Sequence, residues 1–219
     1  MCRIFCAHAP EPFALAPQIE AFAHIAEHSR EYQGHGWGYS AWSGTGWTHY
    51  HDIRPIWDDP TPHAGHSNLL LIHARSAFRD EGIAVENNMP FYDHDNVFIF
   101  NGELRGVRIK AEGRIGAEKI FNFVKRFERH GMSAALAKGT NIISKRSRYV
   151  RAMNIIMASP DGIHVASSFA EDPGYFQLRV NQQDDRLTIC SDPLSGRGQW
   201  DAGEWREFPN HHNESFTRW

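Results

Sequence analysis

Apolar side chains recur with a helical spacing in three parts of the chain. These parts are residues 17–30, 117–129 and 132–137. In the second part, Ile120 and Val124 lie about one turn apart, so their side chains share a face. The first part begins near a proline, which the first turn of a helix tolerates because its N–H groups have no intrahelical partner. We therefore expect one helix early in the chain and two near its middle.

Shorter apolar or alternating runs, bounded by Gly, Pro and Asp, predict strands. The runs are 3–7, 37–42, 69–73, 97–100, 153–158, 163–167, 175–180 and 187–191, and a Pro-Asp-Gly turn stands at 160–162. Grouped strands and grouped helices in this order are typical of an α+β fold with two packed sheets covered by helices. Because no repeat or linker interrupts the chain, we expect a single domain over residues 1–219. The long loop 55–67 could cover a site.

The composition excludes several classes of protein. With 23 basic and 26 acidic side chains and a net charge of −3, no overall positive field attracts nucleic acid or an anionic membrane. No apolar run reaches the roughly 20 residues that span a bilayer. The N-terminus also lacks the apolar stretch and cleavage site of a secretory signal. We expect a cytoplasmic protein without a nucleic-acid or membrane partner.

Three cysteines, at positions 2, 6 and 190, form no C-x-x-C pair, which argues against a disulfide framework and a structural zinc site. Cys2 is a candidate nucleophile, because removal of the initiator methionine leaves its thiol beside a free α-amine. A thiol titrates near about 8.5 and an α-amine near about 8, so a proton passes between them at little cost. The alternative is an inert cysteine that packs in the core.

Two further positions carry candidate chemistry. Asn101-Gly102 between apolar residues is the leading signal for a hairpin turn, but the amide side chain and the backbone N–H could also hold an oxyanion. Both interpretations can hold together. Arg75 ends an apolar run, where its guanidinium suits a substrate carboxylate. The alternative for Arg75 is an ion pair with Asp80 or Glu81.

Taken in order, these residues and their neighbours resemble the class II glutamine amidotransferases, which are N-terminal-nucleophile hydrolases. The motifs are Met-Cys-Arg at 1–3, His-Gly-Trp-Gly-Tyr at 35–39, Ile-His-Ala-Arg-Ser-Ala at 72–77, Glu-Asn-Asn-Met-Pro-Phe at 86–91 and Phe-Asn-Gly-Glu-Leu at 100–104. Segments 154–162 and 190–194 look like sheet strands of the stand-alone members. The resemblance thus covers nearly the whole chain, and it implies a four-layer αββα sandwich.

The resemblance also assigns roles. Cys2 would be the nucleophile after loss of Met1, Asn101 and Gly102 the oxyanion hole, and Arg75 the clamp on the substrate's α-carboxylate. Attack on a γ-glutamyl amide would form a thioester that water hydrolyses. The other residues expected to bind substrate are Trp37, Ser76, Ala77, Gly116 and Glu118.

One departure concerns the substrate's α-ammonium. Family members often have Thr-Asp-Ser-Glu at the start of a helix after the Asn-Gly pair, and the Asp holds that ammonium. Here the stretch at 115–118 is Ile-Gly-Ala-Glu. Loss of such a partner costs about 2–5 kcal/mol of binding. Asp80, Glu86 and Glu118 are the acids that could replace it.

Other departures make the expected pocket more apolar. Met89 stands where the family commonly has His before Pro-Phe, Phe100 where it has His before Asn-Gly, and Phe78 where a Thr or Ser follows the arginine. We therefore expect a substrate other than free glutamine even if the chemistry is retained.

Histidine is abundant, with 14 residues, but it does not outline a metal site. The pairs with ligand-like spacing are His24 with His28, His49 with His51, and His63 with His66. None has a further ligand in a spacing that defines a site. We expect structural or solvent-facing histidines, no metal and no cofactor.

Three hypotheses remain open. The leading one is an amidohydrolase that acts on a small glutamine-like or γ-glutamyl substrate through Cys2, alone or as an ammonia-supplying subunit beside a separate synthase chain. The second is a catalytically silent member that binds or regulates. The third is a histidine-ligated metal hydrolase. No synthase domain is expected in 219 residues. The possible partners of the chain are therefore a separate synthase chain or further copies of itself.

Overall fold

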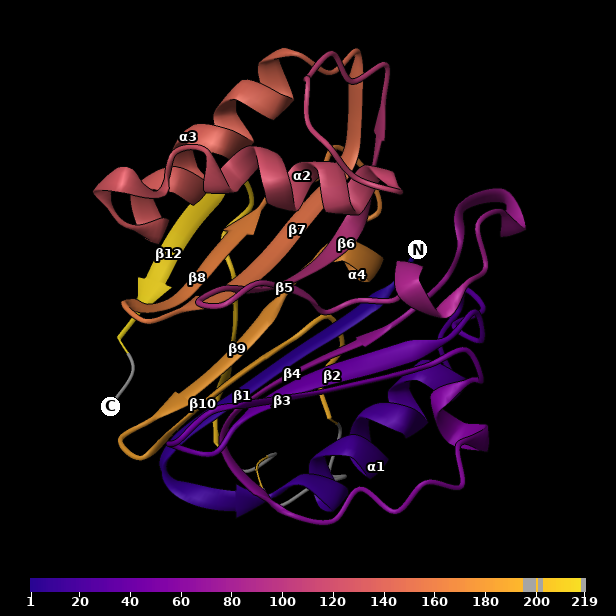
Figure 1. Cartoon of the computed structure of the whole chain (residues 1–219), viewed down its shortest axis with the longest axis vertical. Coiled ribbons are helices and arrows are strands. Elements are labelled where there is room, and N and C mark those ends of the chain that lie inside the picture. The colour runs from indigo at the N-terminus through magenta and orange to yellow at the C-terminus, as the bar shows by residue number, and fades with distance from the viewer. Residues whose placement is uncertain (195–199, 201–202, 218–219) are drawn as a thin grey trace. The chain divides into compact units, whose positions relative to one another are not determined.

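The computed structural model describes residues 1–194, 200 and 203–217, and the chain divides into two compact units. The first unit comprises Met1–Pro90 and Gln177–Phe208. The second comprises Phe91–Phe176 and the described residues of the C-terminal segment, 209–217. Each unit is built around its own antiparallel sheet (Figure 1). The expected single domain over residues 1–219 stays a prediction.

The first unit is a seven-stranded sheet with the order β11-β9-β10-β1-β4-β2-β3. Its strands are β1 (Arg3–Ala14), β2 (Trp37–Trp42), β3 (Trp47–Asp52), β4 (His66–Ala74), β9 (Arg179–Gln183), β10 (Arg186–Cys190) and β11 (Trp205–Glu207). Helix α1 (Leu15–Glu27) lies along one face (Figure 1). Short 3-10 helices stand at Ile56–Asp58, Phe78–Asp80 and Val85–Asn87.

Side-chain alternation decides what the two faces of this sheet carry. Phe5 of β1 and Ile72 of β4 belong to the core that packs against Phe22 of α1. Residues one position away point to the opposite face. Since Arg3 of β1 pairs with Ala74 of β4, the residues just outside that pair face each other at the end of the sheet.

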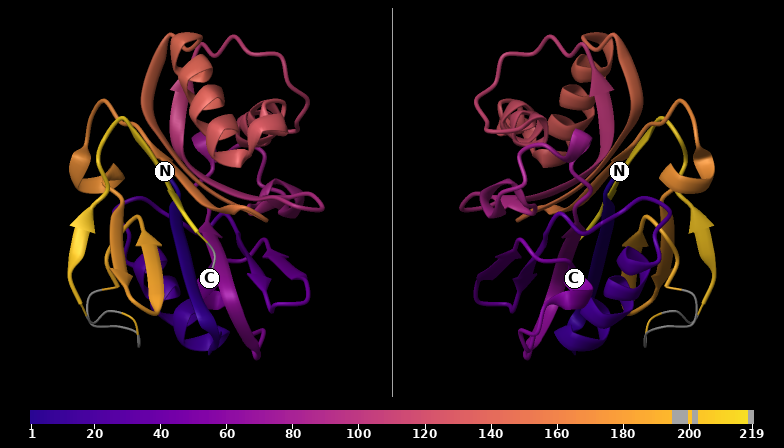
Figure 2. Two further views of the ribbon diagram at one scale, coloured as in Figure 1. Left: turned by 90° about the vertical axis from the view of Figure 1, so that its left-hand side faces the viewer. Right: turned by 90° about the vertical axis from the view of Figure 1, so that its right-hand side faces the viewer.

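The second unit is a five-stranded sheet with the order β12-β8-β7-β6-β5. Its strands are β5 (Phe91–Tyr92), β6 (Val97–Arg105), β7 (Tyr149–Ser159), β8 (Gly162–Ser167) and β12 (His212–Phe216), and its helices are α2 (Gly116–Lys125), α3 (Met132–Lys145) and the short α4 (Pro173–Phe176). Figure 2 shows α2 and α3 on one face of the sheet. Phe98 of β6 meets Phe121 of α2 there, with ring centroids 5.3 Å apart.

The expected α+β class with two mainly antiparallel sheets is confirmed.

Three local predictions are wrong. Asn101-Gly102 is not a hairpin turn, because both residues continue β6 and pair with β7. The strand expected over 175–180 begins only at Arg179, because Pro173 starts a short helix before it. The helix expected over 132–137 continues to Lys145 and includes Gly139, which lets α3 approach Val124 of α2 closely.

No helix in the described part of the chain has both the length and the apolar character needed to cross a membrane.

Candidate active site

The register of β1 and β4 brings together Cys2 and the segment that follows β4. Cys2 precedes Arg3 and Arg75 follows Ala74, and Arg3 pairs with Ala74. The Cys2 thiol donates to the backbone oxygen of Ser76 at 3.7 Å. Cys2 and Ser76, which are 74 positions apart in the sequence, therefore meet at one end of the sheet, on the face opposite α1.

The surroundings of Cys2 act on its thiol in opposite directions. Burial raises the pKa of Cys2 above its usual value, while the N-terminal ammonium, the Ser76 contact and the charge of Arg75 lower it. The N-terminal ammonium itself pairs with the Glu31 carboxylate. The thiol is therefore protonated near neutral pH and needs a base before it can attack. Cys6 and Cys190 are fully buried core residues.

Arg75 is a buried cation whose contacts are neutral. Its side chain is 5% exposed, and it donates to the backbone oxygen of Gly82 at 2.8 Å and to Oδ1 of Asn88 at 3.3 Å. Neither Asp80 nor Glu81 forms an ion pair with it. The Cys2 thiol, when it ionises, is a negative charge that acts on Arg75 and raises its pKa, whereas burial lowers that pKa. A buried charge without a counter-ion is costly, so this arrangement favours an anionic ligand.

His35 fixes the segment that carries Arg75. Its Nδ1 accepts a hydrogen bond from the backbone N–H of Ala77 at 2.8 Å, so the ring is neutral and carries its proton on Nε2. That nitrogen lies 3.4 Å from the Asp80 carboxylate. Burial lowers the pKa of His35, Asp80 raises it, and Arg75 lowers it again. Asp80 is thus engaged with His35 instead of Arg75.

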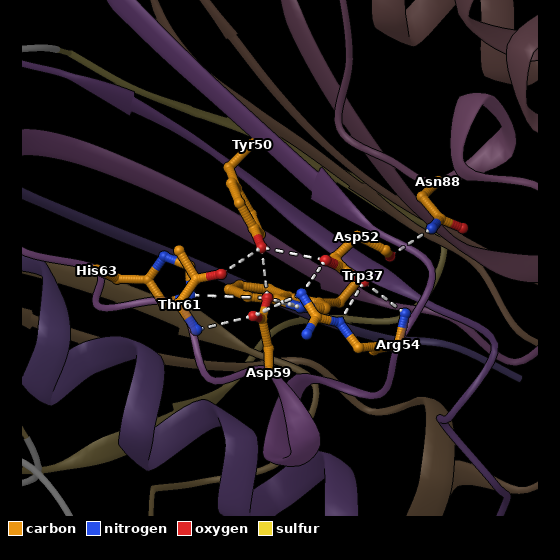
Figure 3. A network of polar contacts seen from close by, with 8 residues as sticks. All are labelled: Trp37, Tyr50, Asp52, Arg54, Asp59, Thr61, His63 and Asn88. Atoms are coloured by element: carbon orange, nitrogen blue, oxygen red, sulfur yellow. Dashed lines mark hydrogen bonds and ion pairs between the residues drawn. The ribbon is translucent and has the colours of Figure 1, made fainter.

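Trp37 does not join this group, although the sequence placed it there. Its indole is fully buried in the core beneath the sheet face that α1 covers. The indole N–H donates to Oδ2 of Asp59 at 3.1 Å. Figure 3 shows Trp37 inside a polar network with residues of the loop after β3. The alternation along β2 places its side chain on the face opposite Arg75.

The centre of that network is the Asp59 carboxylate, whose side chain has no exposed surface. It accepts hydrogen bonds from the Tyr50 hydroxyl at 2.6 Å and from the backbone N–H of Thr61 at 3.0 Å. Burial raises the pKa of Tyr50 to about 12, and its bond to Asp59 adds to the effect. Arg54 joins Asp59 to Asp52 (Figure 3). The long loop expected to cover a site is therefore anchored by buried polar contacts.

The second unit holds Asn101, the expected oxyanion donor. Its side chain is fully buried, and neither the amide nitrogen nor the amide oxygen has a hydrogen-bond partner within the described structure. Phe98 and Phe100 lie on the α2 side of β6, so Asn101 points to the other face. A buried amide without partners is destabilising, and such a group is typical of a binding site.

Gly102 presents its backbone N–H at a strand edge. Met153 of β7 lies opposite Gly102, but its backbone N–H and C=O are both bonded to Ser168. Gly102 and Met153 are therefore a pair without mutual hydrogen bonds, so the N–H of Gly102 points away from β7. On that side, β5 pairs with β6 only at Val97 and Phe98. Within the described chain, no strand therefore covers the edge at Gly102.

Gly116 and Glu118 lie in the first turn of α2. Gly116 is exposed, and a Cβ atom there would have nothing within 4 Å. The Glu118 carboxylate accepts hydrogen bonds from the backbone and guanidinium of Arg114 at 2.5 and 2.6 Å. These hydrogen bonds lower the pKa of Glu118. Glu118 is thus already neutralised, which weakens it as a replacement for the missing acid.

One histidine pair has metal-like spacing in the structure. One potential ligand atom from each of His24, Glu27 and His28 lies within 4.8 Å of the others on α1. Glu27 and His28 are exposed. The other histidine pairs make structural contacts, as His49 does with Ser40 at 2.7 Å and His51 with the backbone oxygen of Pro90 at 3.0 Å. The expectation that no metal is bound stays a prediction.

Comparison with known proteins finds similarity in structure. No protein-family model matches the chain, and no curated protein matches it in sequence. The glutamine phosphoribosylpyrophosphate amidotransferase of B. subtilis superimposes with a TM-score of 0.70 at 15% identity over 99% of this chain. The chain spans 49% of that enzyme's length.

Two shorter proteins match over nearly their whole length. A glutamine aminotransferase class-II domain protein from Silicibacter pomeroyi gives a TM-score of 0.66 at 15% identity, covering 99% of this chain and 95% of that one. A predicted glutamine amidotransferase from Pseudomonas aeruginosa gives 0.62 at 15% identity, covering 99% and 97%. The chain therefore has the fold of the class II glutamine amidotransferase domains, as its motifs predict.

Several residues of the site were not singled out from the sequence. His35, Gly82, Asn88 and Asp59 act through contacts with residues far from them in the chain. His35 and Asn88 lie within the motifs at 35–39 and 86–91, and this position was the feature of the sequence that could have pointed to their roles. The contacts of Gly82 and Asp59 depend on loop conformation and leave no pattern in the sequence.

Proposed function

We propose that the chain is an N-terminal-cysteine amidohydrolase that cleaves a glutamine-like or γ-glutamyl amide. The observation that carries this proposal is the buried Arg75 guanidinium, which has no carboxylate partner among the residues that the structure describes and lies beside the Cys2 thiol. A carboxylate-bearing substrate supplies the missing anion and places its amide near the nucleophile. The fold shared with class II glutamine amidotransferase domains supports the same chemistry.

In the proposed reaction, removal of Met1 exposes the α-amine of Cys2. That amine takes the thiol proton, and the sulfur attacks the amide carbon. The resulting oxyanion accepts hydrogen bonds from Nδ2 of Asn101 and the N–H of Gly102. The C–N bond then breaks, and the leaving amine takes the proton from the α-ammonium. Water, deprotonated by the α-amine, hydrolyses the thioester and restores the thiol.

The substrate is proposed to differ from free glutamine. Gly116 offers no negative charge for an α-ammonium, and Glu118 is engaged by Arg114. Ser76 and Ala77 directly follow Arg75, the proposed carboxylate clamp, and are proposed to bind the substrate, whereas Trp37 lies in the core. Ammonia release to a separate synthase chain and action as a homo-oligomer both remain compatible with this chemistry.

Intact-mass measurement before and after incubation with a diazo-ketone analogue of glutamine tests the proposal. We expect a chain without Met1 that gains one adduct at Cys2, and no adduct in the Cys2→Ala variant. The same variant is expected to lose amide hydrolysis, and activity that survives it would overturn the proposal. Absence of labelling would favour a catalytically silent binding subunit, for which the apolar residues Phe78, Met89 and Phe100 are the motivation.

A further inference from the structure

Asn88 links the Arg75 guanidinium to the end of strand β3. Its Oδ1 accepts from Nη1 of Arg75 at 3.3 Å, and its Nδ2 donates to the backbone oxygen of Asp52 at 2.8 Å. The Asn88 side chain is buried, with 2% exposure. Both ends of a single buried amide are therefore used to connect two elements.

The chemistry of its neighbours fixes which way the amide points. A guanidinium can only donate hydrogen bonds, and a backbone carbonyl oxygen can only accept them. Oδ1 must therefore face Arg75 and Nδ2 must face Asp52. The reversed amide would set donor against donor and acceptor against acceptor. The hydrogen-bonding partners therefore fix the orientation of the amide.

Gly36 provides the space that this connection needs. Its backbone has φ +102°, and a Cβ atom there would lie 2.1 Å from Nδ2 of Asn88 and 2.7 Å from the backbone oxygen of Asp52. The backbone oxygen of Gly36 also accepts from the N–H of Arg75 at 2.9 Å. Only glycine combines this conformation with such close contact. The motif at 35–39 is thus shaped around Asn88 and Arg75.

The far end of the connection belongs to a hydrogen-bond network. Asp52 binds Arg54 through its carboxylate at 2.6 and 3.0 Å and accepts from the Arg54 backbone N–H at 2.7 Å. Arg54 also reaches the buried Asp59 carboxylate at 3.2 Å (Figure 3). Asn88 therefore connects the Arg75 guanidinium to the network that holds the end of β3 and the loop after it.

We propose that Asn88 is a positioning residue, which holds the Arg75 guanidinium through a neutral acceptor and so leaves its positive charge available for an anionic ligand. Gly82, the other acceptor, is neutral as well. An acid at position 88 could also accept from the guanidinium, but it would neutralise the charge and could not donate to the backbone oxygen of Asp52. The identity of the ligand rests on the proposed function, in which it is the substrate carboxylate. An uncharged Asn at position 88, instead of Asp, then gives Arg75 its affinity for that carboxylate.

The test compares Asn88→Asp, which adds a negative charge and removes the hydrogen bond to the backbone oxygen of Asp52, with Asn68→Asp as a control. Asn68→Asp likewise adds a charge and removes hydrogen bonds from the amide nitrogen to backbone oxygens. Asn68 lies on the same strand as the residues before Arg75 but seven positions away, about 23 Å along an extended strand. The first measurement is the rate of iodoacetamide alkylation of Cys2 against pH, with Cys2→Ala as the blank. The groups acting on that thiol are the N-terminal ammonium, Glu31 and Arg75.

We expect Asn88→Asp to raise the apparent pKa of the Cys2 thiol by about 0.5–1 unit, because its carboxylate offsets the charge of Arg75. Asn68→Asp should leave the profile in place. An unchanged profile in folded Asn88→Asp would overturn the proposal. This measurement needs no enzymatic activity. A shifted profile without any amide hydrolysis by the native chain would therefore support the role of Asn88 and contradict the proposed function.

The second measurement uses a γ-glutamyl anilide and an analogue that lacks the α-carboxylate. Asn88→Asp should raise KM for the first at least about tenfold and leave KM for the analogue unchanged. An equal loss for both compounds would show that Asn88 has only a structural role. If Asn88→Asp does not fold, Asn88→Ala replaces it: KM should rise severalfold for the anilide alone, and a loss shared by both compounds overturns the proposal.

Discussion

The Cys2 thiol contacts the backbone oxygen of Ser76 at 3.7 Å, and this contact ties the residue before β1 to the residue after Arg75. It follows from the pairing of Arg3 with Ala74 in the seven-stranded sheet. The nucleophile and the cation proposed to bind the substrate are thereby placed by strand register, which does not depend on the conformation of a long loop.

Substitution of Asn101 by Leu should lower kcat without lowering the free energy of unfolding. Replacement by Leu removes a buried amide that has no partner in the described structure, so the free energy of unfolding should stay the same or rise by about 1 kcal/mol. The same change removes an oxyanion donor and should lower kcat by about 10²–10³. Urea denaturation and steady-state kinetics on the same preparation measure both effects.

The matched control is Asn154, which pairs with Asn101 across β6 and β7 and is equally buried. Its amide donates to the backbone oxygen of Phe176 at 2.7 Å and accepts from Ser167 at 2.8 Å. Asn154→Leu should therefore lower the free energy of unfolding by about 1–3 kcal/mol. Equal destabilisation by the two Leu substitutions would contradict the binding role of Asn101.

Gly116→Asp should improve the use of free L-glutamine. The position is open, since a Cβ atom there meets nothing within 4 Å. A carboxylate in the first turn of α2 is also favoured by the helix dipole. We expect KM for L-glutamine to fall at least about tenfold, and KM for a substrate without an α-amine to stay the same. Gly116→Asn is the uncharged control, and an equal gain from it would exclude the electrostatic explanation.

Asp52 predicts an acid-dependent loss of stability. Hydrogen bonds from Arg54 lower the pKa of Asp52 to about 2, below its ordinary value of about 3.9. Ionised Asp52 therefore stabilises the folded state above about pH 4, and the contribution is lost as the pH falls through about 2. Urea denaturation at pH 5, 3 and 2 should show this decline. In Arg54→Gln the decline should be shallower; an identical pH dependence would show that the pair contributes nothing.

Metal removal should leave amide hydrolysis unchanged, because the proposed chemistry uses the Cys2 thiol and backbone or amide donors. His24, Glu27 and His28 are the described residues with ligand-like spacing. Elemental analysis of the purified protein and activity after EDTA treatment check this. Activity lost on chelation and restored by zinc, but not in His24→Ala, would instead support the metal hydrolase.

Short-range sequence patterns predicted the bounds of strand β2, but they did not predict the direction of its side chains or the conformation of Asn101-Gly102. The apolar period along 37–42 predicted β2 with the bounds that the structure has. The same period did not show that Trp37 points away from Arg75, because a face is defined only once β2 pairs with β4. Asn-Gly favours a hairpin locally, yet pairing with β7 keeps Asn101 and Gly102 extended. Tertiary pairing thus overrode the turn preference.

The sequence by itself determined the α+β class, the candidate nucleophile Cys2 and the candidate cation Arg75, which depend on residue type and local periodicity. The expectation that an acid is missing at Gly116 depends instead on the resemblance to the class II glutamine amidotransferases. The tertiary structure decided that Arg75 has neutral partners, that Asp80 pairs with His35, and that a buried amide of Asn88 holds the guanidinium. Those features arise from contacts between segments far apart in the chain, which local patterns do not encode.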